Sequence, residues 1–133
     1  MTANISYGFK RSVDAPFEAT EARVREALQV EGFGVLTEID IAAAFKAKLD
    51  VDFKPYKILG ACSPPLAHAA LVEEEDIGLL LPCNVIIYQG DEAGQSVVSI
   101  LDPVQQLGVA GRDDLGDLAE EVQARLRRVL HAV

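Results

Sequence analysis

Two cysteines, Cys62 and Cys83, are the side chains of this sequence best suited to chemistry. Cys62 lies just before a helix that Ser63-Pro64-Pro65 predicts, and unpaired backbone amides at a helix start favour a thiolate over a thiol. A thiolate at Cys62 would act as a nucleophile or bind a soft metal ion. Cysteine is also often a small buried hydrophobic residue, and Cys83, which begins a predicted core strand, fits that alternative better.

The direction of two predicted strands decides whether these thiols can act together. Cys62 ends one strand and Cys83, 21 residues later, begins another. If the strands are antiparallel neighbours, both thiols lie at the same edge of the sheet, where a disulfide or a bridging metal ion is within reach. If the helix between them makes a parallel crossover, the thiols lie at opposite ends of the sheet and no two-cysteine site exists.

Three polar residues near the cysteines complete the candidate site. Ser63 and Asn84 each directly follow a cysteine and are expected to line a ligand site with it. His68, six residues after Cys62 on the following helix, would give a site of two cysteines and one histidine for a soft metal ion, with one position open. A lone histidine on a helix is also commonly a surface or capping residue, so a role for His68 without metal binding stays open.

Glu38 and Asp40 form a second candidate, a carboxylate pair for acid-base chemistry at the end of a predicted strand. Asp40 also precedes an apolar helical segment, where an aspartate is a favoured N-cap. Capping therefore explains Asp40 without any chemistry.

The elements that must position these side chains follow from hydrophobic periodicity, which predicts the order β-α-β-α-β-α-β-β-α. Gly32 is well placed to end the first helix. Residues 77–81 are expected to be a buried connection, and residues 102–111 to be rich in turns. The predicted strands cover residues 5–13, 33–39, 54–61, 83–89 and 96–101, and the predicted helices cover residues 14–32, 41–49, 63–71 and 113–130.

These elements indicate an α+β fold, a single sheet with its long helices packed over one face. The last two strands flank Gly90-Asp91-Glu92-Ala93-Gly94 and must be antiparallel, because only a short loop joins them. Earlier connections leave strand direction open. With 133 residues, the chain is expected to form one domain over residues 1–133.

Composition excludes several functions. The chain has 12 Lys and Arg against 21 Asp and Glu, a formal charge of −9, which opposes binding to a phosphate backbone, so no nucleic-acid partner is expected. Hydrophobic residues make up 50% of it, enough for a core and too many for a disordered chain. The sequence lacks the glycine-rich dinucleotide-binding motif and the phosphate-binding loop, so nucleotide hydrolysis and Rossmann redox chemistry are not expected. It also lacks paired histidines at helical zinc spacing and the Gly-x-Ser-x-Gly motif of a nucleophilic serine.

The expected partners and location follow from features that the sequence lacks. No apolar run approaches the roughly 18 residues that a membrane helix needs, so no membrane span is expected. The first residues carry neither the basic nor the apolar region of a secretory signal, and two cysteines are too few for a disulfide framework. A cytoplasmic location is the resulting expectation.

Four segments of the chain match the pattern of a known family: residues 32–40, residues 56–62 with Pro64, residues 76–85, and Asp102-Pro103. Through these segments the chain resembles the domain of unknown function 302 family. The resemblance implies a curved, mainly antiparallel sheet with helices on one face, of the TATA-binding-protein-like type, commonly paired as a homodimer. It favours the antiparallel alternative for the two cysteine strands, and it implies no established reaction.

Three functions remain as hypotheses, and whether the protein is an enzyme stays open. The first is a module that binds a small molecule or a soft metal ion at Cys62 and Cys83. The second is a thiol-dependent redox protein or enzyme, in which Cys62 attacks and Cys83 resolves the intermediate as a disulfide. The third is a dimeric interaction protein without chemistry, which pairs through a sheet edge and the apolar residues 77–81.

Overall fold

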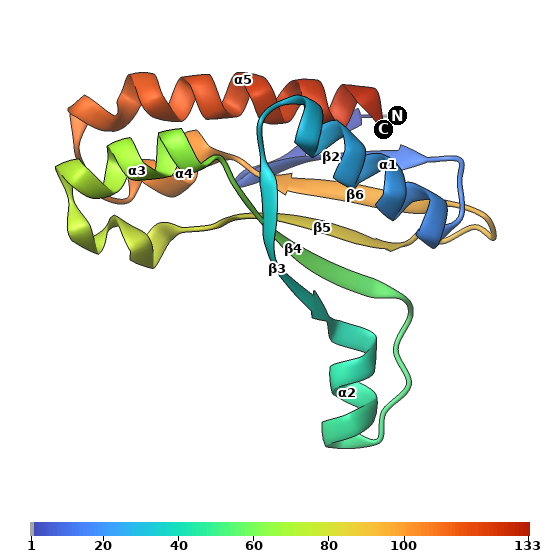
Figure 1. Cartoon of the computed structure of the whole chain (residues 1–133). Coiled ribbons are helices and arrows are strands. Elements are labelled where there is room, and N and C mark those ends of the chain that lie inside the picture. Colours follow the sequence, from blue (N-terminus) through green and yellow to red (C-terminus); the bar gives the residue numbers. More distant parts are fainter. Residues whose placement is uncertain (1) are drawn as a thin grey trace.

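A six-stranded antiparallel sheet organises the chain in the computed structural model, which describes residues 2–133 without the side chains of residues 2–4 and Asp113 (Figure 1). Every pair of neighbouring strands is antiparallel. The order across the sheet is β1-β2-β6-β5-β4-β3. The strands are β1 (Thr2–Ile5), β2 (Gly8–Val13), β3 (Gly34–Asp40), β4 (Tyr56–Cys62), β5 (Cys83–Gln89) and β6 (Ser96–Leu101).

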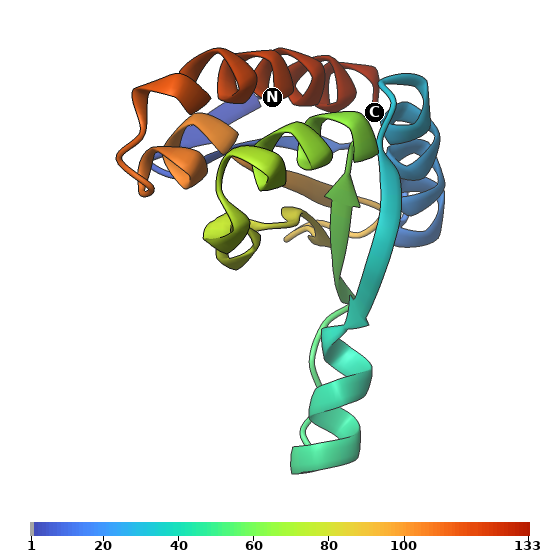
Figure 2. The same ribbon diagram turned by 60° about the vertical axis from the view of Figure 1, so that its left-hand side comes forward.

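Helices cover one face of this sheet, which confirms the α+β prediction. The long helices α1 and α5 lie side by side over the central strands, while α3, η1 and α4 gather at one end (Figure 2). No helix among residues 2–133 has both the length and the apolar character to cross a bilayer. The α-helices are α1 (Phe17–Val30), α2 (Ile41–Leu49), α3 (Pro64–Glu73), α4 (Pro103–Gly108) and α5 (Gly116–Ala132), with short 3₁₀ helices η1 (Glu75–Leu80) and η2 (Asp113–Leu115).

The main core lies between the covered face of the sheet and helices α1 and α5. Alternation along the strands turns every second side chain toward the helices, as Leu59 of β4 and Val85 of β5, a cross-strand pair, show. The facing helices supply stripes of buried residues at helical spacing. The fully buried apolar residues of these helices are Val24 and Leu28 of α1, and Leu126 and Val129 of α5.

Three sequence predictions need correction. Residues 5–13 are two strands rather than one, because the chain turns back at residues 6–7 and β1 pairs with β2. The stretch predicted to be turns contains α4, which begins where Asp102 Oδ1 accepts a hydrogen bond from the Val104 amide at 2.9 Å. Residues 77–81 lie largely in η1, where Ile77 is buried but Leu79 is 87% exposed, so this connection is only partly buried.

One segment leaves the body of the protein. Residues 34–58, which we call the arm, comprise β3, α2, the following loop and the start of β4, and no side chain in the arm is buried. Helix α2, which the sequence predicts over residues 41–49, has no buried residue. Figures 1 and 2 show α2 extending away from α5 beyond the end of the sheet.

The packing of α1 gives the first prediction. Leu28→Ala should lower the free energy of unfolding by roughly 2–5 kcal/mol, because it deletes fully buried atoms and leaves a cavity. Val30→Ala on the same helix should change it by less than about 0.5 kcal/mol, because Val30 is 77% exposed. Urea unfolding followed by circular dichroism measures both values. Equal losses in the two variants would contradict the described orientation of α1.

Candidate functional site

The pairing of β4 brings the two cysteines to one edge of the sheet. Strand β4 is antiparallel to β5, with Ala61 opposite Cys83, and antiparallel to β3, with Gly34 opposite Cys62. The structure therefore has the antiparallel alternative, in which the end of β4 lies beside the start of β5. Both cysteines are free thiols, and no disulfide joins them.

Both cysteines line the same small pocket, between the end of β4 and helices α3, α4 and α5. Its volume is about 40 Å³. Because a single water needs roughly 10–15 Å³ on the same measure of volume, the pocket holds only a few waters or a short apolar group. Nearly all of its lining is apolar. The lining residues are Phe33, Ala61, Cys62, Ser63, Leu66, Ala67, Ala70, Leu81, Pro82, Cys83, Leu107, Leu118 and Val122.

Ser63 and Asn84, the other residues predicted for the ligand site, lie in different places. Ser63 is buried and lines the pocket. Asn84 is exposed and lines a different hollow, with Ile86 and Ser99, because consecutive strand residues point to opposite faces of the sheet. Asn84 therefore does not share a site with Cys83.

The predicted metal site is corrected by the orientation of α3. Leu66, Ala67 and Ala70 face the pocket, which leaves His68 exposed and absent from its lining. Within the described residues, no group of three or more His, Cys, Asp or Glu side chains is placed to hold a metal ion. Cys62, Cys83 and His68 thus do not form the predicted site of two cysteines and one histidine.

Burial keeps both cysteines protonated. It raises the pKa of Cys83 to about 11, with a further increase from the charge of a Cys62 thiolate nearby. Burial also raises the pKa of Cys62. The neutral Cys83 thiol donates a hydrogen bond to Gln106 Oε1 at 3.6 Å. Both side chains are thiols near neutral pH, which contradicts the thiolate predicted for Cys62.

Gln106 of α4 is a site residue that the sequence prediction missed. Its Nε2 donates hydrogen bonds to the Leu80 carbonyl and, at 3.3 Å, to the Pro82 carbonyl, while its Oε1 accepts from Cys83. Gln106 therefore holds the segment that leads into β5 against the pocket. The signal that could have found this helix is Asp102-Pro103, an N-cap followed by a proline in the first turn.

Gly60 allows the close packing beside the pocket. A Cβ atom at this position would overlap Thr37 Oγ1 and lie 2.8 Å from Pro82 Cγ. Any larger residue would force the Thr37 hydroxyl and the Pro82 ring to move. Glycine at this position therefore keeps Pro82, a lining residue, against the strand that carries Cys62.

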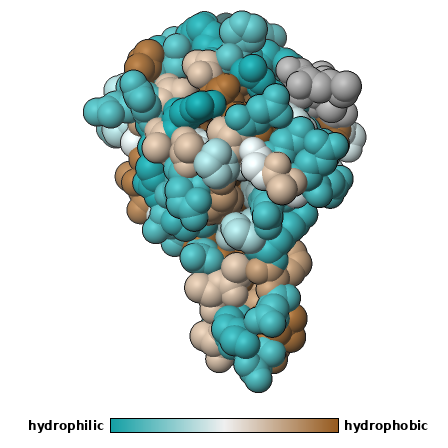
Figure 3. Space-filling model, turned by 90° about the vertical axis from the view of Figure 1, so that its right-hand side faces the viewer, coloured by the Kyte–Doolittle hydropathy of each residue, from teal (hydrophilic) through white to brown (hydrophobic). Residues whose placement is uncertain are grey.

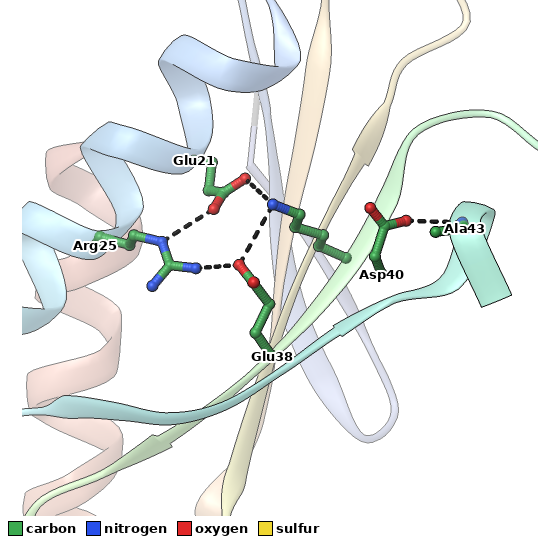
Figure 4. A network of polar contacts seen from close by, with 6 residues as sticks. Glu21, Arg25, Glu38, Asp40 and Ala43 are labelled. Atoms are coloured by element: carbon green, nitrogen blue, oxygen red, sulfur yellow. Dashed lines mark hydrogen bonds and ion pairs between the residues drawn. The ribbon is translucent and has the colours of Figure 1, made fainter.

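The second candidate, the carboxylate pair, is used structurally (Figure 4). Asp40 Oδ1 accepts a hydrogen bond from the Ala43 amide at 2.9 Å and caps α2, as predicted. Glu38 pairs instead with Arg25 of α1 and with Lys57 of β4, whose Nζ lies 3.3 Å from Glu38 Oε1. Glu38 and Asp40 therefore hold the base of the arm and do not face each other as an acid-base pair.

Glu21 of α1 completes this ion network. Lys57 Nζ lies 2.9 Å from Glu21 Oε1, and Arg25 Nε lies 3.0 Å from Glu21 Oε2. Burial favours the neutral form of Glu21, but hydrogen bonds from Lys57 and Arg25 outweigh it and lower the pKa of the carboxyl. The hydrogen bond to Glu21 raises the pKa of Lys57, although burial of the ammonium group acts in the opposite direction. The network joins α1 to both strands of the arm.

Comparisons with known proteins agree with the resemblance seen in the sequence. The family model described as "Domain of unknown function DUF302" matches residues 9–133. The chain is also similar to the crystal structure of an uncharacterized conserved DUF302 protein from Bacillus stearothermophilus, with 29% identity and a TM-score of 0.87. That similarity covers 96% of this chain and 98% of the other. No curated protein matches the chain.

The buried Cys83 thiol predicts a dependence of stability on alkaline pH. Its pKa rises from an ordinary 9.0 to about 11 in the folded protein, so its contribution is complete below pH 9 and is lost as pH rises toward 11. Between pH 8 and pH 11 the free energy of unfolding, measured with urea, should fall less steeply with pH in Cys83→Ala than in the unchanged protein. Cys62→Ala is the matched control and should keep most of the unchanged protein's pH dependence. The same pH dependence in Cys83→Ala and in the unchanged protein would contradict the burial of the Cys83 thiol.

The ion network predicts a dependence on acidic pH. Lys57→Met should lower the free energy of unfolding at pH 7 by roughly 1–3 kcal/mol, because it leaves Glu21 without its nearest cation. The lowered pKa of Glu21 contributes stability above its ordinary value of 4.5, which is lost as pH falls, and this loss should shrink in Lys57→Met. Glu121→Gln, which removes an exposed pair with Arg125, should cost less than about 0.5 kcal/mol. Urea unfolding of both variants at pH 7 and pH 4 measures these free energies. Equal losses of stability in Lys57→Met and Glu121→Gln would contradict the role of the network.

Proposed function

The chain belongs to the DUF302 family, which carries no reaction in its description, and from this premise we propose a function based on the pocket itself. The protein is a small-molecule-binding module that takes a short apolar group of its ligand between helix α3 and the thiols of Cys62 and Cys83. The observation that carries this proposal is the apolar pocket with two free, protonated thiols in its wall. Apolar pockets with a few convergent polar groups are the usual form of small-molecule sites.

The chemistry of the lining defines the ligand class. An apolar group that enters the pocket displaces water from hydrocarbon and from two polarizable sulfurs, which favours its transfer from solvent. Ser63 in the lining supplies a hydroxyl that can orient the ligand, while Gln106 holds Cys83 in place from behind. The small volume limits the inserted part to a methyl or a short chain, and bulkier parts of the ligand would stay outside.

A soft metal ion is a weaker candidate for the same pocket. Two thiolates suit such an ion, but both cysteines must lose their protons first. With a pKa of about 11, deprotonating Cys83 at pH 7 costs about 5 kcal/mol at 1.36 kcal/mol per pKa unit. The raised pKa of both cysteines likewise argues against Cys62 as a nucleophile and Cys83 as a resolving thiol, because thiol exchange requires a thiolate.

Filling the pocket tests the proposal. Xenon, a small apolar probe, should shift the methyl NMR signals of Leu66, Leu107 and Val122 saturably in the unchanged protein. Ala67→Leu should abolish the shifts, because the added side chain occupies the pocket. Ala69→Leu, on the exposed face of the same helix, is the matched control and should keep them.

The outcomes separate the alternatives. Shifts that persist in Ala67→Leu, or no shift in the unchanged protein, would contradict an accessible apolar site. Copper(I) titration is the companion measurement. If copper(I) binds with a stoichiometry of one and the Cys62→Ser/Cys83→Ser variant loses that binding while xenon has no effect, the metal alternative replaces the proposal.

A further inference from the structure

The face of the sheet away from α1 and α5 carries a hollow lined by basic side chains, which we call the cationic hollow. Its lining includes Lys10 of β2, Tyr88 of β5 and Lys54, which precedes β4, and its volume is about 370 Å³. Lys10 and Tyr88 alternate with the buried residues Phe9 and Ile87, so they point to the face that the helices leave uncovered. Lys54 comes from the arm, which Figure 3 shows at the bottom of the view.

The cationic hollow holds positive charge that its own residues do not neutralise. Among the described residues, neither Lys10 nor Lys54 has an ion-pair partner. Lys54 Nζ lies 4.8 Å from the centre of the Tyr88 ring. Arg11 also lines the hollow, but its guanidinium donates to two backbone carbonyls at the end of α5. With Asp91 in the lining, two ammonium groups face one carboxylate, and this excess of one positive charge suits a monoanion.

A second hollow adjoins the first on the same face, and we call it the apolar hollow. It has a volume of about 190 Å³ and a mostly apolar lining that includes Tyr7, Ile86 and Leu101. Lys10 lies opposite Ser99 in the pairing of β2 with β6, and Ser99 lies opposite Ile86 in the pairing of β6 with β5. Because Lys10 lines the cationic hollow while Ser99 and Ile86 line the apolar hollow, one row of cross-strand neighbours connects the two.

Together the hollows form a groove with charge at one end and hydrocarbon at the other. Ser12 lies opposite Val97 in the cationic hollow, and Gly8 lies opposite Leu101 in the apolar hollow. From Ser12 to Gly8 is four residues, about 13 Å along a strand. An alkyl chain of medium length that runs this distance would cover apolar side chains that solvent now reaches, which favours its transfer from water.

We propose that the groove binds a soluble monocarboxylate with an alkyl chain of medium length, whose carboxylate lies between Lys10 and Lys54. Each ammonium group would donate a charge-assisted hydrogen bond to the carboxylate. The formal charge of −9 does not prevent this contact, because charges more than about 8 Å apart are largely screened at physiological ionic strength. The groove shares no lining residue with the cysteine pocket, so the inference does not depend on the function proposed for that pocket.

Octanoate, followed by two-dimensional NMR of the isotope-labelled chain, is the probe. It should shift amide signals of β2, β5 and β6 saturably. Octylamine has the same alkyl chain with the opposite charge and should not bind. Each methylene added between butanoate and octanoate should tighten binding by about fourfold, as expected when a methylene leaves water. Ala67→Leu, which fills the cysteine pocket, should bind octanoate as the unchanged chain does.

Charge variants test the cationic hollow. Lys10→Met/Lys54→Met should weaken octanoate binding by more than about tenfold, because it removes both ammonium groups. Lys46→Met/Lys48→Met makes the same change of net charge at exposed residues of α2 outside the groove, and this matched control should keep the affinity. Asp91→Asn should strengthen binding by roughly twofold to fivefold, because it removes a carboxylate that repels the ligand.

A filled groove tests the apolar hollow. Asn84 is exposed and lines this hollow, so Asn84→Phe should place a ring where the alkyl chain lies and weaken octanoate binding by more than about tenfold. Gln89→Phe, at an exposed residue of the same strand outside both hollows, is the matched control and should keep the affinity. Circular dichroism of each variant checks that it is folded.

Three results would overturn the inference. The first is the absence of saturable shifts with octanoate, or equal binding of octanoate and octylamine. The second is an equal loss of affinity in Lys10→Met/Lys54→Met and in Lys46→Met/Lys48→Met, or weaker binding in Asp91→Asn, since either would mean that the charges of the hollow do not hold the ligand. The third is octanoate binding that Ala67→Leu abolishes, which would assign the ligand to the cysteine pocket and leave the groove without one.

Discussion

The antiparallel pairing of β4 with both β3 and β5 is the constraint on which the rest of the structure depends. Its register sets Ala61 opposite Cys83 at one end and Lys57 opposite Asp40 at the other. The first pair fixes the wall of the pocket, and the second fixes the base of the arm. A slip by one residue would turn Leu59 and Ala61 out of the core, so burial holds the register and, with it, the pocket wall and the base of the arm.

The two halves of β4 are stabilised in different ways. Residues 59–61 are buried against the helices, and their stability comes from hydrocarbon removed from water. Residues 56–58 are only half-buried, and there the strand relies on its backbone pairing, the stacked Tyr56 and Tyr88, and the ion network of Lys57. Lys57 and Glu21 are sufficiently shielded from solvent for their pairing to matter more than an ordinary surface ion pair.

Sequence patterns predicted most of the fold and less of the site, for identifiable reasons. Alternation and turn residues located the β5–β6 hairpin, and Gly32, with a φ of +85°, ends the turn after α1 as expected. The side on which a helical residue lies depends on tertiary packing, so spacing alone placed His68 beside the cysteines when α3 turns it outward. Likewise, an apolar helix such as α2 has the same pattern whether its face meets its own core or a second chain. The lysines among its apolar residues were the available signal that it lies outside the core.

The pocket and helix α2 lie near opposite ends of β4, so substitutions at the two places can be separated. From Tyr56 to Cys62 is six residues, about 20 Å along an extended strand. Substitutions farther apart than about 7–10 Å that share no partners usually have additive effects on stability. No residue of α2 or of the loop after it lines the pocket, and the pocket residue Ala67 lies outside the arm. A substitution in either place should therefore change its own part of the chain and leave the other part unchanged.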